Sequence, residues 1–311
     1  MIEEAARKIE NMEVRGAARI AKFAAETLKN YALTVRWDFD KEMQKAAQRL
    51  LNTRPTAVSL FNAINYVMNY SGKTDEEKRK DLVKRAEQFI KWVDTAREII
   101  GKIGAKRIQE DSVILTHCNS SAALSVIKTA FDEGKVSEVI ATESRPRYQG
   151  HLTAKELADY GIDVTLIVDS AVRYFIKDVD YVIVGADTIT VNGALINKIG
   201  TSQIALAAKE ARVPFMVAAE TYKFSPKTLF GELVVIEERS GDEVAPRELL
   251  EHPKIKVRNP AFDVTPRDYI DLIITEIGAI PPEMSYIIIR DHLQYSVFGL
   301  EEIEMNAKHY D

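Results

Sequence analysis

The chain has 311 residues, of which 46% are hydrophobic and 29% are charged, and its formal net charge is −5. This is the composition of a globular protein, and the length predicts two domains or one large domain with an appendage. The acidic balance argues against a broad nucleic-acid-binding surface, and no stretch approaches the roughly 20 apolar residues that a membrane-spanning helix needs.

The single cysteine, Cys118, excludes an intramolecular disulfide and argues against a cysteine-based zinc site. The five histidines are scattered and match no metal-ligand spacing. The first residues, Met1–Lys8, are charged and are not followed by the apolar core of a signal peptide. We therefore expect a cytoplasmic protein with no bound metal, no nucleic-acid partner and no membrane contact.

Residues 1–104 are predicted to form a helical domain. Apolar side chains recur there at intervals of three and four residues, in patterns that cover residues 9–28, 43–51, 58–67 and 82–100. Thr74 and Asp75 are the candidate N-caps of the last and longest helix. Gly101 and Gly104 then indicate the end of that helix and a linker.

From residue 105 onward, short apolar runs alternate with helical patterns. The expected strands are Val113–Leu115, Val139–Ala141, Val164–Val168, Tyr181–Val184, Phe215–Ala218 and Leu272–Ile274. Such continuous runs are typical of strands covered on both faces, and their alternation with helices predicts a parallel, doubly wound sheet. The predicted fold class is α/β, with an N-terminal helical domain (residues 1–104) followed by a doubly wound, mostly parallel Rossmann-like sheet domain (residues 105–311).

Ligands of open parallel sheets bind at the carboxyl ends of the strands, so the residues that follow each strand are the candidate site. Cys118 follows the first expected strand and precedes a helix whose candidate caps are Asn119, Ser120 and Ser121. A helix N-terminus favours a thiolate, and its backbone N–H groups can bind a phosphate. The alternative is that Cys118 is merely a small buried apolar residue.

Asp187 follows the fourth expected strand, after Gly185 and Ala186. A carboxylate in this place can act as a general base or bind sugar hydroxyls, and the alternative is a helix or turn cap. Arg145 lies in the loop after the second strand, where the alternative is a solvated surface charge. These groups, converging on one edge of the sheet, suit an anionic substrate and proton transfer.

Three further cations are candidates for binding a phosphate. Arg15 lies on a mostly apolar helix face beside Gly16, which suggests an anionic partner. Arg54 precedes a proline at an expected helix start, and proline is in any case favoured at a first helical position. Lys198 is expected to open a helix, where a cation is unfavourable for the helix dipole, and a bound phosphate would explain it.

Several common enzyme signatures are absent. The sequence contains no GxxxxGK[ST], no GxGxxG and no GxSxG. ATP hydrolysis, hydride transfer and serine-type hydrolysis therefore lose support.

The same strand-end residues resemble one superfamily, which contains methylthioribose-1-phosphate isomerase, ribose-1,5-bisphosphate isomerase and the alpha, beta and delta subunits of eukaryotic translation initiation factor 2B. The similar segments span nearly the whole chain in the same order. They are Arg15–Gly16, Arg54–Val58, Thr116–Cys118, Glu143–Pro146, Gln149–Gly150, Gly185–Asp187, Asn192–Gly193, Asn197–Thr201 and Asn259–Pro266.

Three segments resemble the ribose-1,5-bisphosphate isomerases in particular, namely Met12–Ala17, Cys118–Ala123 and Ala219–Phe224. The second enters its helix directly, without the glycine-rich stretch typical of methylthioribose-1-phosphate isomerase. Asn119 departs from the pattern, because histidine is expected there in close relatives.

The resemblance implies conversion of α-D-ribose 1,5-bisphosphate to D-ribulose 1,5-bisphosphate in archaeal nucleotide salvage. It implies Asp187 as the first acid and Cys118 as the base, AMP as an activator, a homohexamer built from dimers, and no cofactor. The residues expected to bind substrate or phosphate are Arg15, Gly16, Arg54, Ser120, Arg145, Gln149, Asn197, Lys198 and Lys223.

Two other functions remain open. Methylthioribose-1-phosphate isomerase would need an apolar subsite in place of a second phosphate site. A non-enzymatic regulatory subunit of the translation-factor type would use the same pocket as a sensor, and it would not need both Cys118 and Asp187.

Overall fold

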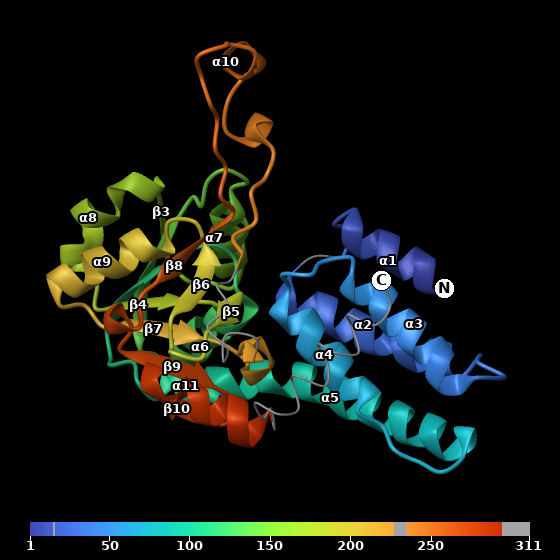
Figure 1. Cartoon of the computed structure of the whole chain (residues 1–311). Helices are drawn as coiled ribbons and strands as arrows, with labels where there is room; N and C mark the ends of the chain where they lie inside the picture. Colours follow the sequence, from blue (N-terminus) through green and yellow to red (C-terminus); the bar gives the residue numbers. More distant parts are fainter. Residues whose placement is uncertain (15, 227–234, 294–311) are drawn as a thin grey trace. The chain divides into compact units, whose positions relative to one another are not determined.

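The computed structural model describes residues 1–14, 16–226 and 235–293 (Figure 1). The chain divides into two compact units, Met1–Ala96 and Arg97–Asp311. None of the helices in the described ranges is both long enough and apolar enough to cross a membrane.

The first unit is helical. Its helices are α1 (Ile2–Glu10), α2 (Ala17–Ala32), α3 (Phe39–Leu51), α4 (Val58–Met68) and most of α5 (Asp75–Ala105). Each of the first four buries one face, and α2 packs its apolar face against α4. Thr74 caps α5, because its Oγ1 accepts a hydrogen bond from the Glu77 N–H at 3.2 Å.

The second unit is built on a seven-stranded sheet with the spatial order β10-β9-β7-β4-β1-β2-β3. All neighbours are parallel except β10 and β9. The strands are β1 (Ser112–Thr116), β2 (Val136–Thr142), β3 (Val164–Ile167), β4 (Tyr181–Val184), β7 (Phe215–Ala218), β9 (Leu272–Thr275) and β10 (Gly278–Ile280).

Alternate side chains of these strands enter two different cores. Leu115 and Ile140 pack into the core that also holds Ile204 of α9 (Thr201–Ala211). Ile114 and Val139 pack into the core on the other face, with residues of α5, α6 (Ser121–Asp132) and α7 (Gln149–Asp159). Successive residues of a strand point to opposite faces of the sheet, so a strand buried on both faces needs apolar residues at consecutive positions, which explains the continuous apolar runs.

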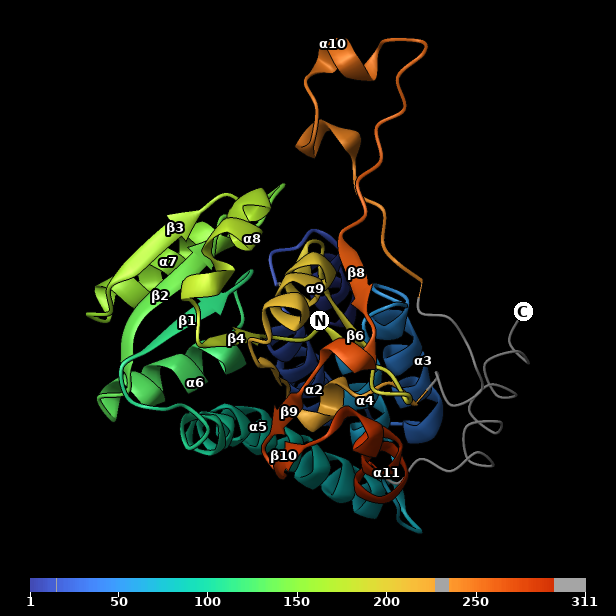
Figure 2. The ribbon, with the colours of Figure 1, turned by 90° about the vertical axis from the view of Figure 1, so that its left-hand side faces the viewer.

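A smaller antiparallel sheet lies beside the main one in the same unit. It consists of β5 (Thr188–Ile189), β6 (Leu195–Lys198) and β8 (Phe262–Thr265) in that order. The segment before β8, residues 237–261, is called the arm below, and its outer part with α10 (Arg247–Leu250) projects from the unit in both views (Figures 1 and 2). The remaining short helices are α8 (Val172–Phe175) and α11 (Ser285–Ile287).

The predicted α/β class, with N-terminal helices and a mostly parallel doubly wound sheet, is confirmed. Three local expectations were wrong. Gly101 and Gly104 do not end the long helix, because both lie within α5, which continues to Ala105. Lys198 ends the strand β6 and does not open a helix, because α9 begins at Thr201. Arg54 and Pro55 lie in the turn before α4, whose first residue is Val58.

Candidate active site

The side chains of interest follow the carboxyl ends of β1, β2 and β4, which are neighbours in the sheet. Cys118 lies two residues after the end of β1. Asp187 lies between β4 and β5, where its N–H donates to the Ile196 carbonyl at 3.0 Å. The predicted convergence of a thiol and a carboxylate on one sheet edge therefore has a structural basis in the parallel order of these strands.

The backbone of Cys118 has an unusual conformation and is fixed by hydrogen bonds to neighbouring side chains. Its φ is 67°, a left-handed conformation that non-glycine residues rarely adopt. Its N–H donates to Ser144 Oγ at 2.7 Å, and its carbonyl accepts from Thr153 Oγ1 at 2.7 Å. Thr153 Oγ1 also accepts from Asn119 Nδ2 at 3.0 Å. Two buried hydroxyl groups thus hold the backbone that presents the thiol.

His117 extends this hydrogen-bond network, because its Nδ1 lies 3.3 Å from Ser144 Oγ. Its Nε2 lies 2.9 Å from the Ile199 carbonyl, and its Nδ1 lies 2.6 Å from Thr142 Oγ1. A carbonyl only accepts, so Nε2 carries the proton and Nδ1 accepts from the Thr142 hydroxyl. Burial lowers the pKa of His117, against the opposing charge of Asp169. The imidazole is therefore a neutral structural link between β1, β2 and the turn before α9.

The electrostatic environment keeps the Cys118 thiol protonated. Burial raises its pKa to about 11, and the Asp187 charge acts in the same direction. Lys198 and Arg239 lower it, as does the Asn119 N–H, but burial is the largest cause. The thiolate expected from the helix N-terminus is thus not the resting form.

Lys198 supplies a buried positive charge beside the thiol. Only 4% of the residue is exposed. Its Nζ donates to the Ala261 carbonyl at 3.2 Å and lies 4.9 Å from the centre of the Phe262 ring. Burial lowers its pKa, whereas Cys118 and Asp187 raise it. Cys118, Asp187 and Lys198 therefore act on one another electrostatically.

The N-terminus of α6 lies against the end of β4. Ser120 is the N-cap, and its Oγ accepts from the Ala123 N–H at 3.3 Å. A Cβ on Gly185 would lie 2.1 Å from that Oγ, so only glycine permits this approach. The N–H groups of Ser121 and Ala122 belong to the first turn and have no acceptor within the helix.

Asp169 organises the loop after β2. Its carboxylate accepts from the Ser144 N–H at 2.8 Å and from the Arg145 N–H at 2.7 Å. The Arg145 guanidinium donates to the Tyr148 hydroxyl at 2.5 Å and stacks over that ring at 5.1 Å. Gln149 begins α7, and its Oε1 is buried without a hydrogen-bond partner among the described residues. This unsatisfied oxygen is suited to accept a hydrogen bond from a hydroxyl group of a ligand.

Two other predicted ligands have partners within the protein. Asn197 is buried in β6, and its Nδ2 donates to Thr201 Oγ1 at 3.1 Å. Lys223 is buried, and its Nζ lies 2.7 Å from Glu220 Oε2. Both side chains therefore have a structural role, beside which their predicted role in binding substrate stays a prediction.

The remaining predicted ligands belong to the first unit or lie outside the described residues. Arg15 lies outside them. Gly16 is the N-cap of α2, with φ 92°. Arg54 lies in the turn between α3 and α4, and its carbonyl accepts from the Ala57 N–H at 3.0 Å. Their predicted roles stay predictions.

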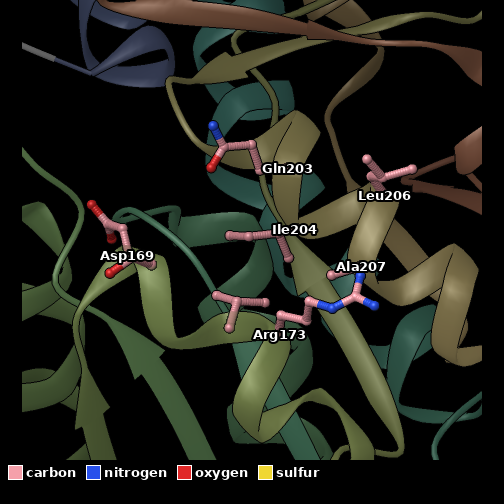
Figure 3. Close-up of a pocket in the computed structure, with 8 residues that line it drawn as sticks. Asp169, Arg173, Gln203, Ile204, Leu206 and Ala207 are labelled. Carbon is pink, nitrogen blue, oxygen red and sulfur yellow. The ribbon is translucent and has the colours of Figure 1, made fainter.

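A separate hollow lies beside the sheet edge (Figure 3). It has a volume of about 190 Å³ between α8 and α9, and Asp169, Arg173 and Gln203 provide polar groups around an apolar floor. Cys118, Asp187 and Lys198 do not line it. Within the described ranges, no group of three or more His, Cys, Asp or Glu side chains is arranged to hold a metal ion.

Sequence reasoning missed several residues of the site. Ser144 and Asp169 lie two residues after the ends of β2 and β3, and this placement is a signal that could have identified them. Asp263, in β8, accepts from the Gly200 N–H at 2.8 Å and from the Ser202 N–H at 3.1 Å. Arg239 lies in the arm, far from Cys118 in sequence, and no local pattern indicated it.

Comparison with known proteins places the chain in one family. Residues 13–282 match the initiation factor 2 subunit family. The chain is 71% identical over 309 residues to a ribose 1,5-bisphosphate isomerase of Archaeoglobus fulgidus, covering 99% of this chain and 98% of that protein. A ribose 1,5-bisphosphate isomerase of Methanocaldococcus jannaschii is 58% identical, with 94% and 95% covered.

A solved structure agrees with this assignment. The crystal structure of a Pyrococcus horikoshii OT3 protein, described as translation initiation factor eIF-2B, is similar with a TM-score of 0.78 and 34% identity. The similarity covers 90% of this chain and 97% of that one. The chain therefore belongs to the initiation factor 2 subunit family.

Proposed function

We propose that the chain is an aldose–ketose isomerase that converts α-D-ribose 1,5-bisphosphate to D-ribulose 1,5-bisphosphate. The observation that carries the proposal is the placement of the Cys118 thiol, the Asp187 carboxylate and the buried Lys198 within electrostatic reach at one sheet edge. The name shared by the relatives at 71% and 58% identity supports the choice of substrate.

The substrate has a phosphate on its anomeric oxygen, so its ring does not open as that of a free sugar does. In the proposed reaction Asp187 protonates the ring oxygen while Cys118 removes the proton on C2. The C2–H electrons form a C1=C2 double bond, and the bond between C1 and the ring oxygen breaks. Cys118 then protonates C1, and Asp187 takes the proton of the O2 hydroxyl, which leaves the C2 ketone and restores both side chains.

The protons in the resting site suffice for this reaction. The reactive form needs a Cys118 thiolate and a protonated Asp187, which together hold one proton. The resting form, a thiol beside a charged Asp187, also holds one. Moving that proton from sulfur to carboxylate prepares the site. A phosphate brought near Asp187 favours the shift, because a like charge disfavours the carboxylate.

The proposal extends to the substrate's surroundings. The N–H groups of Ser121 and Ala122 and the cation of Lys198 are suited to bind a phosphate. The Gln149 amide is suited to bind a sugar hydroxyl. AMP as an activator, a homohexamer built from dimers, and a cytoplasmic role in nucleotide salvage belong to the same proposal.

The test is conversion of α-D-ribose 1,5-bisphosphate by the purified chain, with and without AMP, followed by the appearance of ribulose 1,5-bisphosphate. We expect turnover that AMP increases. A folded protein that gives no product with AMP present would contradict the proposal. Methylthioribose 1-phosphate would then be the next substrate to assay. Binding to translation initiation factor 2 without either activity would favour the regulatory-subunit alternative.

A further inference from the structure

Arg239 lies at the base of the arm, in a segment whose Glu237 is linked to Lys198 through Ala261. The Ala261 N–H donates to the Glu237 carbonyl at 2.8 Å, and the Arg239 N–H donates to the Asn259 carbonyl at 2.9 Å. The Ala261 carbonyl in turn accepts from Lys198 Nζ at 3.2 Å. Glu237 and Arg239 therefore belong to a strand-like segment that runs directly beside the buried lysine.

The two carboxylates of this segment hold two different arginines. Glu237 accepts from Arg239 Nε at 3.1 Å, and only 13% of the Arg239 side chain is exposed. Glu238 pairs instead with Arg258, whose side chain is 76% exposed. Neighbouring residues of an extended segment point to opposite sides, so one ion pair lies on the inner side and the other is solvated.

The inner side holds two cations close together. The positive charge of Arg239 lowers the pKa of both Lys198 and Cys118. Arg239 and Lys198 therefore both act electrostatically on the thiol. Among the residues that the structure describes, Lys198 makes no ion pair with a carboxylate. Two neighbouring cations of low exposure repel each other, and the burial of Lys198 without a paired carboxylate is costly. A dianionic ligand would remove both penalties.

We propose that Arg239 binds the phosphate on C1 of the sugar together with Lys198, and that Glu237 holds the guanidinium in place until that phosphate arrives. The inference rests on the proposed function and adds a ligand to its site. The C1 phosphate is the relevant one because Arg239 acts next to Cys118, which removes the proton on C2. The phosphate on C5 is at the other end of the sugar.

The guanidinium suits this role better than a second lysine would. Its planar fork matches two phosphate oxygens at once, and it keeps its charge under all conditions. The phosphate stays on C1 while the C1=C2 double bond forms, so a bidentate contact would fix the reacting carbon as well as bind the substrate.

Binding measurements with three sugar phosphates test the assignment. Titration calorimetry in a Cys118→Ser background, chosen to slow turnover, would use α-D-ribose 1,5-bisphosphate, α-D-ribose 1-phosphate and D-ribose 5-phosphate. Adding Arg239→Ala should weaken binding of the two C1 phosphates by the same factor, about 10- to 100-fold. Binding of ribose 5-phosphate should change less than about twofold.

Three further variants control for folding and charge. Arg258→Ala removes the exposed arginine of the same segment and should leave all three affinities unchanged. Arg239→Lys keeps the charge without the fork and should recover part of the loss. Glu237→Gln removes the competing carboxylate and should bind the two C1 phosphates at least as tightly as the parent.

Other patterns would overturn the inference. These are an equal loss for all three sugars, no loss, or a loss confined to ribose 5-phosphate. The proposed function fails separately, through absence of turnover in protein that retains Cys118, and the binding pattern still tests Arg239 in that case. A parent that binds none of the sugars would overturn both proposals.

Discussion

The two sides of the candidate active site are built from different chemistry. On the side of β1, β2 and α7, the groups next to Cys118 are neutral: Ser144 and Thr153 hold its backbone, and the buried His117 and Thr142 bond each other beside Ser144. The Asp169 carboxylate acts there on the backbone of Ser144 and Arg145. On the side of β6, β8 and the arm, the groups are ionisable, namely Lys198, Glu237, Arg239 and Asp263.

The two sides therefore affect different properties of Cys118: the first fixes the position of its thiol, and the second affects the thiol's protonation. Neutral hydrogen bonds in a buried network fix geometry and change little with salt or with pH near neutrality. Charged groups of low exposure act over longer distances and set the protonation state of their neighbours. Cys118 and Asp187 lie where the two kinds of environment meet, so substitutions on each side should fail in different ways.

The largest effect on kcat is expected from substitutions of Cys118 and Asp187, which lie between the two sides. Cys118→Ser and Asp187→Asn should each reduce kcat by about 10²- to 10⁴-fold, because each removes a proton-transfer group. Both variants keep the size of the side chain, so their circular dichroism and unfolding midpoints should match those of the unaltered protein. Normal turnover of either folded variant would remove that residue from the mechanism.

A smaller effect is expected on the neutral side. Ser144→Ala removes the acceptor of the Cys118 N–H, which should cost about 1–3 kcal/mol of stability. Because the thiol then loses its fixed position, kcat should fall roughly tenfold while KM stays constant. Steady-state kinetics together with denaturant unfolding would measure both changes.

Thr27→Ala is the matched control for this variant. It removes a buried hydroxyl of the first unit, whose Oγ1 donates to the Phe23 carbonyl at 2.7 Å. It should lose some stability and no kcat. If Ser144→Ala loses stability in the same way without any change in kcat, Ser144 does not position the thiol.

The smallest effect concerns the charged side. Burial raises the pKa of Asp263 to about 6, from a model-compound value of 3.8. Between these values the folded protein holds a proton that the unfolded chain has released, so this group's contribution to stability is lost as pH rises from about 4 to 6. Asp263→Asn should abolish that loss.

The measurement is the difference in free energy of unfolding between Asp263→Asn and the unaltered protein. As the pH is raised from 4 to 7, this difference should change by roughly 1–3 kcal/mol in favour of the variant. A constant difference across that range would mean that Asp263 does not titrate there. A change in the opposite direction would mean that its pKa is lowered by its two N–H donors.

Much of the fold followed from local patterns. Each expected strand overlaps an observed one, because a strand covered on both faces must be apolar at every position. The antiparallel β10 and the small sheet of β5, β6 and β8 were not predicted. Their strands have only two to four residues, which is too short to show a clear apolar pattern, and β8 pairs with β6 from more than 60 residues away in sequence.

The misplacement of Lys198 has the same origin. The pattern around Asn197 is compatible with a helix start, and pairing with β8 decides that it is a strand. Similarly, a cysteine before a capped helix indicates a thiolate by local rules. The observed direction of its pKa comes from burial, which depends on side chains from elsewhere in the chain.

Local patterns in the sequence predicted the α/β class, the sheet edge of the candidate site, and the positions of Cys118 and Asp187 just after strands that end on that edge. These depend on periodicity and on the rule that parallel strands end on the same side. The protonation of the thiol, its support by Ser144 and Thr153, and the effect of Arg239 on Lys198 became visible only in the folded structure. Those properties depend on burial and on contacts between residues distant in sequence, and no local pattern contains them.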